Sequence, residues 1–206
     1  MPSSHHLQLN ELVDTILKLN PKSVLDIGVG FGKYGVLIRE YLDPDIGQGD
    51  QSRQIRIDGI EIFPPYITPL HSYIYDHIYM GNALEILPSL SNTYDLILLI
   101  DVLEHFDSQQ GAQLITHSLD KCKIIIISTP HNPGHQTEVY GNTAERHIKR
   151  WTIRDLRNFG KVQVVPNLFS LICILSPMNN TTLPGTTFKR NVIEWFYRRM
   201  MYVYYR

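Results

Sequence analysis

Short apolar segments alternate with helical patterns along most of this sequence, and this alternation constrains the fold more than any other feature. The apolar runs at 94–100 and 123–128 have the character of strands buried on both faces of a parallel sheet. Apolar residues at helical spacing occupy stretches between such runs. Because parallel strands need long crossover connections, the pattern predicts an α/β layered fold with right-handed crossovers.

Seven strands and several helices can be assigned from this pattern. The predicted strands are 24–27, 55–62, 77–80, 94–100, 123–128, 162–165 and 169–175. The predicted helices start near residue 9 and cover 33–42, 108–119 and 153–159, and 65–75 is a helix or an irregular turn. Asn10 is the predicted cap of the first helix, and Thr152 with Asp155 caps the last. Only residues 166–168 separate the last two strands, which predicts an antiparallel hairpin.

Length and charge limit the class of protein. The chain has 206 residues, enough for one domain with a sizeable core, and a net charge of -1 gives no overall attraction to nucleic acid. Cys122 and Cys173 lie in apolar runs and are expected to be buried thiols. Residues 1–6 lack the apolar segment of a secretory signal, and no apolar run is long enough to span a bilayer. A cytoplasmic location is therefore expected.

Three glycines follow the first predicted strand. Gly28, Gly30 and Gly32 lie where a strand ends and a helix begins, which is where open α/β sheets bind ligands. Glycine permits positive φ and lets backbone N–H groups approach a ligand. A dinucleotide motif can be read from Gly30 to Gly35, but that register leaves Asp26 and Gly28 unexplained. A phosphate-binding P-loop lacks its Gly-Lys-Ser/Thr, and a tight turn without a ligand is the remaining alternative.

The flanking residues distinguish these alternatives. Val24-Leu25-Asp26-Ile27-Gly28-Val29-Gly30-Phe31-Gly32 resembles the first motif of class I S-adenosylmethionine-dependent methyltransferases. The resemblance implies that the methionine part of the cofactor lies against Asp26, Gly28, Val29, Gly30 and Gly32.

Two later segments extend the resemblance. Glu61, followed by Ile62, matches the family's acid that accepts hydrogen bonds from both ribose hydroxyls. Gly81-Asn82-Ala83 resembles the family's Gly-Asp-Ala, which implies adenine recognition by Asn82 and Ala83. Asparagine replaces aspartate there, and an ordinary turn at Asn82 remains an alternative.

The segment from Tyr94 to His105 resembles the family's fourth strand, with the Val-Leu-Glu-His ending of small-molecule methyltransferases. It implies cofactor contacts from Asp101 and Val102. The resemblance covers about residues 22–176 and implies a Rossmann-like, seven-stranded, mostly parallel sheet with a C-terminal antiparallel hairpin and helices on both faces. The catalytic domain would span 1–177, including an N-terminal helix at 1–20. The cofactor would be S-adenosyl-L-methionine and the product S-adenosyl-L-homocysteine.

Methyl transfer to an alcohol or amine requires in-line positioning and removal of a proton. Candidate groups are Glu104 and His105 after the fourth strand, His131 after the fifth, and His147 before the last helix. Histidine suits this role because its pKa lies near neutral pH. A structural role in a loop is the alternative for each histidine. No metal is expected, because His131, His135, Glu145 and His147 are irregularly spaced. Trp151 is predicted to be a packed anchor.

Residues 178–206 form a predicted linker and a basic, aromatic C-terminal helix. Residues 188–206 carry a net charge of +4. Three roles remain open: docking on the domain or on a partner subunit in a homodimer, peripheral membrane contact, and RNA contact.

The predicted function is methyl transfer to a hydroxyl or amine of a small-molecule acceptor, such as a sugar or glycan, a lipid or a secondary metabolite. The alternatives are a cofactor-binding module without catalysis and an RNA-modifying methyltransferase. Nucleic acid is the less favoured partner, because no Asn/Asp-Pro-Pro-Tyr/Phe motif follows the fourth strand.

Overall fold

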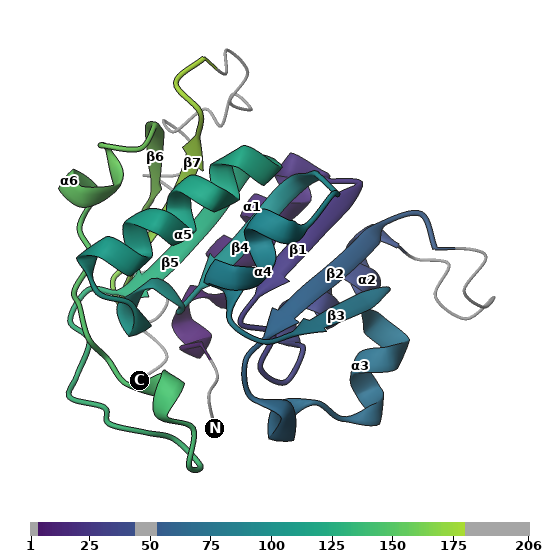
Figure 1. Cartoon of the computed structure of the whole chain (residues 1–206). Helices are drawn as coiled ribbons and strands as arrows, with labels where there is room; N and C mark the ends of the chain where they lie inside the picture. The colour runs from purple at the N-terminus through teal and green to yellow at the C-terminus, as the bar shows by residue number, and fades with distance from the viewer. Residues whose placement is uncertain (1–3, 44–52, 180–206) are drawn as a thin grey trace, which may run out of the picture.

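The protein is built around a seven-stranded mixed sheet (Figure 1). The computed structural model describes residues 4–43 and 53–179. The strands are β1 Ser23–Ile27, β2 Arg56–Glu61, β3 His77–Met80, β4 Tyr94–Ile100, β5 Cys122–Pro130, β6 Lys161–Val165 and β7 Ser170–Ser176. Their order is β3-β2-β1-β4-β5-β7-β6. β1 to β5 pair in parallel with one another, and β7 is antiparallel to both β5 and β6. The predicted sheet and C-terminal hairpin are confirmed.

Helices cover both faces of the sheet (Figure 1). They are α1 Leu9–Leu19, α2 Lys33–Leu42, α3 Pro69–Ile74, α4 Ala83–Ser89, α5 Ser108–Lys121 and α6 Ile153–Leu156. Short 3-10 turns are η1 His6–Gln8, η3 Pro64–Tyr66, η4 Leu103–His105 and η5 Thr143–Glu145. α1 and α2 pack together on one face, and α4 and α5 pack together on the other.

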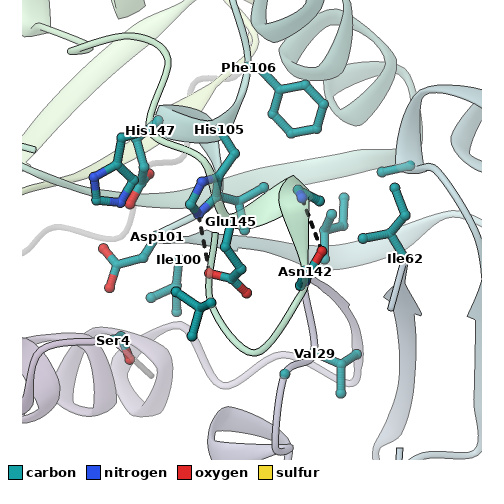
Figure 2. A pocket seen from close by; sticks show the side chains of 18 of the residues that line it. Ser4, Val29, Ile62, Ile100, Asp101, His105, Phe106, Asn142, Glu145 and His147 are labelled. Carbon is teal, nitrogen blue, oxygen red and sulfur yellow. Dashed lines mark hydrogen bonds and ion pairs between the residues drawn. The ribbon is translucent and has the colours of Figure 1, made fainter. Parts of the chain in front are cut away.

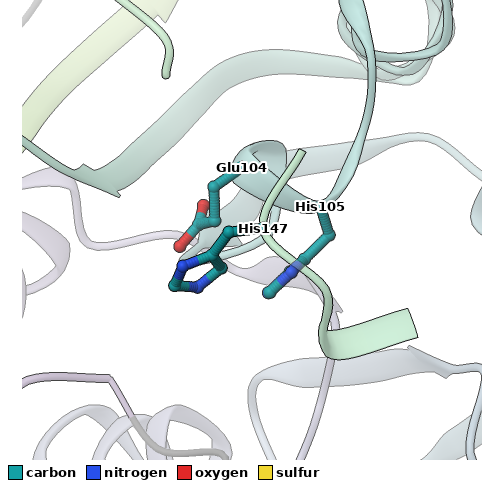
Figure 3. A group of neighbouring side chains, drawn as sticks. All are labelled: Glu104, His105 and His147. Carbon is teal, nitrogen blue, oxygen red and sulfur yellow. The ribbon is translucent and has the colours of Figure 1, made fainter. Parts of the chain in front are cut away.

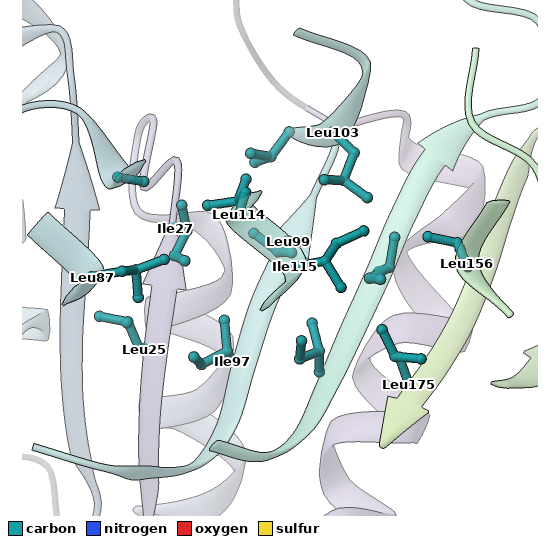
Figure 4. Packing of buried hydrophobic residues seen from close by; sticks show 14 of the residues in the cluster. Leu25, Ile27, Leu87, Ile97, Leu99, Leu103, Leu114, Ile115, Leu156 and Leu175 are labelled. Carbon is teal, nitrogen blue, oxygen red and sulfur yellow. The ribbon is translucent and has the colours of Figure 1, made fainter. Parts of the chain in front are cut away.

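The central strands bury side chains on both faces, as the continuous apolar runs predict. Leu25 and Ile97 belong to the cluster beneath α4 and α5, where Leu87 and Leu114 meet them (Figure 4). The alternate residues, such as Leu96, belong to the cluster beneath α1 and α2. Because successive side chains of a strand point to opposite faces, each central strand contributes to both layers.

Several helix boundaries differ from the predictions. The cap of α1 is Gln8 and not Asn10, because η1 already turns the chain into a helical path before Leu9. The capping box of Thr152 and Asp155 is confirmed, but α6 ends at Leu156. α4 was not predicted, and Pro88 in its last turn explains why its helical signal is weak.

A buried arginine joins α2 to α3 and to the residue that precedes β3. The Arg39 guanidinium donates to Asp43 Oδ2 and Asp76 Oδ2, each at 2.8 Å, and Nε donates to Ile74 O at 2.8 Å. Arg39 is 1% exposed, so these partners replace the water that its charge loses. Residues 44–52, between α2 and β2, lie outside the described part of the chain.

Other expectations concern the thiols and the C-terminal tail. Both cysteines are free, and burial raises the pKa of each thiol to about 12. Cys173 is buried as predicted, whereas Cys122, at the first position of β5, is half-buried. No helix within 4–43 and 53–179 has the length and apolar character to cross a membrane. The predicted C-terminal helix lies in 180–206, outside the described residues.

Candidate active site

A cavity of about 730 Å³ lies at the carboxyl ends of the parallel strands (Figure 2). All the residues predicted to contact the cofactor line it except Gly32: Asp26, Gly28, Val29, Gly30, Glu61, Ile62, Asn82, Ala83, Asp101 and Val102. Its volume is within the usual range for sites that bind small molecules and cofactors. The strand order places the ends of β2 and β3 on one side of the cavity and the ends of β4 and β5 on the other.

The glycine loop after β1 needs its glycines. Gly28, Gly30 and Gly32 have φ values of +76°, +55° and +80°. A Cβ at Gly28 would lie 2.8 Å from Val102 Cγ2, so a side chain there would clash with the loop that follows β4. Gly32 caps α2 and donates its N–H to Val29 O at 2.9 Å, so it shapes the turn without reaching the cavity.

Asp26 lies at the end of β1 and is 3% exposed. Its Oδ2 accepts a hydrogen bond of 2.7 Å from the Tyr75 hydroxyl. Burial raises the pKa of the Asp26 carboxyl to about 7, the Tyr75 hydrogen bond opposes this, and the nearby negative charge of Glu61 adds to it. A positive charge placed beside this carboxyl would therefore favour its ionised form near neutral pH.

Glu61 connects β2 to the glycine loop. Its Oε2 accepts from Gly30 N and its Oε1 accepts from Phe63 N, both at 2.9 Å. Burial raises the pKa of Glu61, and these backbone donors oppose that rise. Each carboxylate oxygen can accept more than one hydrogen bond, so both oxygens retain capacity for a ligand.

Asn82 serves as the cap of α4 and also lines the cavity. Its Oδ1 accepts from Leu84 N at 3.0 Å, which satisfies a backbone donor at the helix start. The turn that the sequence left open as an alternative is therefore present. An adenine contact by this side chain could use its amide N–H groups or the remaining lone pair of Oδ1.

Asp101 has an unusual backbone conformation, with φ at +54° for a residue that is not glycine. Gln8 Nε2 donates to Asp101 Oδ2 at 2.6 Å, and Ser128 Oγ donates to Gln8 Oε1. Ser4 also reaches this cavity, where it hydrogen-bonds the Lys33 ammonium (Figure 2). The sequence pattern did not reveal that the N-terminal segment closes this side of the cavity.

Glu104, His105 and His147 lie beside Asp101, on the side of the cavity away from Glu61 and Ile62. Figure 2 places His105 and His147 across the cavity from Ile62. The two imidazole rings are 5.3 Å apart between centroids. His105 Nδ1 lies 3.1 Å from Arg146 O, and His147 Nδ1 lies 2.8 Å from Gly134 O. Burial lowers the pKa of His105, which favours its neutral form.

Glu104 is buried beside these rings, with 1% of its surface exposed. Its Oε2 makes no hydrogen bond within the described part of the protein. Burial raises the pKa of Glu104 well above its usual value, and the negative charge of Asp101 adds to this effect. Its backbone carbonyl accepts from Ile148 N at 2.7 Å and Lys149 N at 3.2 Å, so the loop that carries His147 is fastened to the η4 turn.

The structure does not bring His131 to the cavity. Its Nε2 lies 3.2 Å from Asn167 O, and its N–H donates to Phe169 O at 3.0 Å. His135 does not line the cavity either. Sequence reasoning missed Tyr66, whose hydroxyl donates to Glu145 Oε1 at 3.2 Å and so connects η3 to the loop above the cavity. Trp151 is 3% exposed and is the packed anchor that was expected.

Comparisons with solved structures identify the fold. No protein-family model and no curated protein sequence matches this chain. A SAM-dependent methyltransferase from Archaeoglobus fulgidus superimposes with a TM-score of 0.58 at 18% identity, covering 82% of this chain and 93% of its own. Magnesium protoporphyrin IX methyltransferase from Synechocystis PCC 6803, solved with bound SAH, gives 0.57 at 15% identity, covering 84% and 83%.

A third structure is described as an O-methyltransferase from Nostoc punctiforme PCC 73102. It gives a TM-score of 0.57 at 17% identity and covers 82% of this chain. The present chain spans 56% of the length of that protein. The fold is therefore the Rossmann-like fold of S-adenosylmethionine-dependent methyltransferases.

Proposed function

We propose that this chain, which has the fold of S-adenosylmethionine-dependent methyltransferases, transfers a methyl group from that cofactor to a hydroxyl or amine of a small molecule. One observation carries the proposal. A single cavity joins the glycine loop and Glu61 on one side to Glu104, His105 and His147 on the other. The proposed acceptors are sugars or glycans, lipids and secondary metabolites.

The residues on the first side fit the cofactor. Gly28 and Gly30 present backbone without side chains to the cavity, and the Glu61 carboxylate can accept from two vicinal ribose hydroxyls. Asp26 would face the ammonium of the methionine part, where a positive charge favours its ionised form. The cofactor, when bound, supplies an activated methyl group on a sulfonium.

Glu104, His105 and His147, on the second side, would bind the acceptor and remove its proton. The His105 Nδ1–H can donate to the Arg146 carbonyl, which leaves Nε2 as the nitrogen able to accept a proton. The lowered pKa of His105 keeps that nitrogen unprotonated at neutral pH. These proton-handling groups support catalysis over a module that only binds the cofactor.

The test of this proposal measures release of S-adenosylhomocysteine by the whole chain in the presence of S-adenosylmethionine and a panel of small hydroxyl and amine compounds. We expect turnover with at least one class of acceptor, reduced in His105→Ala and retained in His131→Ala. Turnover that is the same in His105→Ala as in the unaltered protein would contradict the assigned acceptor side.

Cofactor binding should depend on pH through Asp26. Its pKa in the free protein is about 7, and a bound cation favours the ionised carboxylate, so binding below pH 7 must release a proton. Affinity for S-adenosylmethionine should therefore rise from about pH 5 to about pH 7, by at most about tenfold per pH unit, and then level off. Titration calorimetry in buffers of different ionisation enthalpy measures both affinity and proton release. Asp26→Asn should bind more weakly and lose this pH dependence, and an unchanged profile in that variant would rule Asp26 out as the group responsible.

A further inference from the structure

Three potential metal ligands converge at the acceptor side of the cavity. One carboxylate oxygen of Glu104 and one ring nitrogen each of His105 and His147 lie within 4.8 Å of one another. Figure 3 shows that Glu104 and His105 come from the same turn and that His147 approaches from the neighbouring loop. Two imidazoles and one carboxylate are a ligand set found in zinc and non-haem iron sites. This set differs from the one considered in the sequence, which contained His131 and His135.

Hydrogen bonds prepare both imidazoles for coordination. Nδ1 of His105 faces the carbonyl of Arg146 at 3.1 Å, and Nδ1 of His147 faces the carbonyl of Gly134 at 2.8 Å. Because a carbonyl only accepts, a hydrogen bond to it requires the proton on Nδ1, which leaves each Nε2 with its lone pair. Nε2 of His105 lies 3.9 Å from Glu145 Oε2. Histidines that bind metals commonly donate their other ring N–H to a carbonyl in this way.

Glu104 supplies an observation that is independent of the histidines. Its Oε2 is buried and no described residue is placed to make a hydrogen bond of normal geometry to it, although the Thr129 hydroxyl, also without a partner, lies near this carboxyl. Leaving a buried carboxyl oxygen without a partner is destabilising. Such an oxygen is expected where a ligand completes the site.

We propose that Glu104, His105 and His147 bind a divalent transition-metal ion, of the class that includes Zn²⁺, Mn²⁺, Fe²⁺ and Co²⁺. Magnesium and calcium are disfavoured because they prefer all-oxygen ligand sets. Ligands at about 2.1 Å from a tetrahedral ion lie about 3.4 Å apart. The three groups therefore need a modest inward rotation of their side chains to close on the ion.

The ion would take part in the proposed methyl transfer, and its role rests on that proposed function. A hydroxyl oxygen of the acceptor would take an open position on the ion, which lowers the pKa of that hydroxyl. Because His105 Nε2 is a ligand when the ion is bound, the proton then passes to water and not to that nitrogen. The oxygen–methyl bond then forms as the sulfur–methyl bond breaks, and the electron pair of the broken bond stays on sulfur. This arrangement favours hydroxyl acceptors over amines.

Co²⁺ is a suitable probe because its visible spectrum reports the number and type of ligands. We expect the chelator-treated whole chain, purified without a histidine tag, to bind one equivalent of Co²⁺ with a visible absorption band. Zn²⁺ should displace Co²⁺ and abolish the band, and Mg²⁺ should not. Glu104→Ala and His147→Ala should each weaken Co²⁺ binding by about 100-fold or more.

Two controls separate this site from other histidines. His131→Ala removes a histidine that lies outside the cavity, and it should leave the spectrum and stoichiometry unchanged. His5 and His6 have stacked rings near the same cavity, but neither is a proposed ligand. The variant His5→Ala/His6→Ala should therefore also retain the band. Equal Co²⁺ affinity in the unaltered protein, Glu104→Ala and His147→Ala would overturn the proposal.

Titration with S-adenosylhomocysteine distinguishes an error in the proposed metal site from an error in the proposed function. Each variant is first titrated with S-adenosylhomocysteine, and retained binding shows that the variant is folded. Retained cofactor binding without a Co²⁺ band in the unaltered protein would overturn the metal site alone. Absence of cofactor binding by the unaltered protein would instead contradict the proposed function.

Discussion

Replacing Glu61 with alanine is expected to weaken binding of S-adenosylhomocysteine by about 100-fold or more. The carboxylate would lose its hydrogen bonds to two ribose hydroxyls, and hydrogen bonds to a charged group contribute about 1.5–3 kcal/mol each. The variant also loses the acceptors for Gly30 N and Phe63 N, so the glycine loop becomes less well ordered. Titration calorimetry with S-adenosylhomocysteine measures the loss directly.

Two variants serve as controls for Glu61. Glu61→Gln keeps the volume and one acceptor oxygen, so its affinity should lie between that of Glu61→Ala and that of the unaltered protein. Glu85→Ala removes an exposed acid from the first turn of α4 and should bind as the unaltered protein does. Full affinity in Glu61→Ala would show that this acid does not contact the cofactor.

Replacing Trp151 with alanine is expected to lower the free energy of unfolding by about 4 kcal/mol. The indole is 3% exposed and belongs to the cluster beneath α5, and its Nε1 donates to Leu103 O at 2.7 Å. Its loss would leave a void and a carbonyl without a donor at the turn that carries Glu104 and His105. Urea unfolding followed by circular dichroism gives the difference in free energy.

A double-mutant cycle with Gly111 tests the same contact from the other side. A Cβ at Gly111 would lie 2.1 Å from Trp151 Cζ2, so Gly111→Ala alone should be strongly destabilising. In the Trp151→Ala background the same glycine change should cost little, because the ring that obstructs it is gone. Additive effects of the two changes would contradict the packing described for this turn.

The β–α alternation was sufficient to predict the sheet, because strands buried on both faces leave continuous apolar runs. α4 escaped prediction because Pro88 weakens its helical signal. The sequence pattern predicts the cap of α1 at Asn10, whereas η1 leads directly into the helix at Leu9. The Gln8 side chain makes no capping hydrogen bond and is held by Asp101 and Ser128, far along the chain, so local sequence could not predict its role.

The two sides of the candidate site differ in how far the sequence could predict them. Residues on the cofactor side follow strand ends directly, so their order along the chain predicts their place at the cavity. The acceptor side depends on how the loop after β5 folds back, and sequence could not separate His131 from His147 there. The backbone hydrogen bonds from Ile148 and Lys149 to Glu104 O hold His147 at the cavity. His131 is held away from it by a backbone hydrogen bond to Phe169 O and a side-chain hydrogen bond to Asn167 O, just before β7.

Titration of the unaltered whole chain with S-adenosylhomocysteine tests the central claim most directly. The account predicts one binding site per chain, together with thermal stabilisation that grows with ligand concentration and reaches about 2.7 kcal/mol at 100 times the dissociation constant. Neither heat of binding nor any shift in the melting temperature, in a sample shown to be folded, would contradict the assignment of this cavity to S-adenosylmethionine.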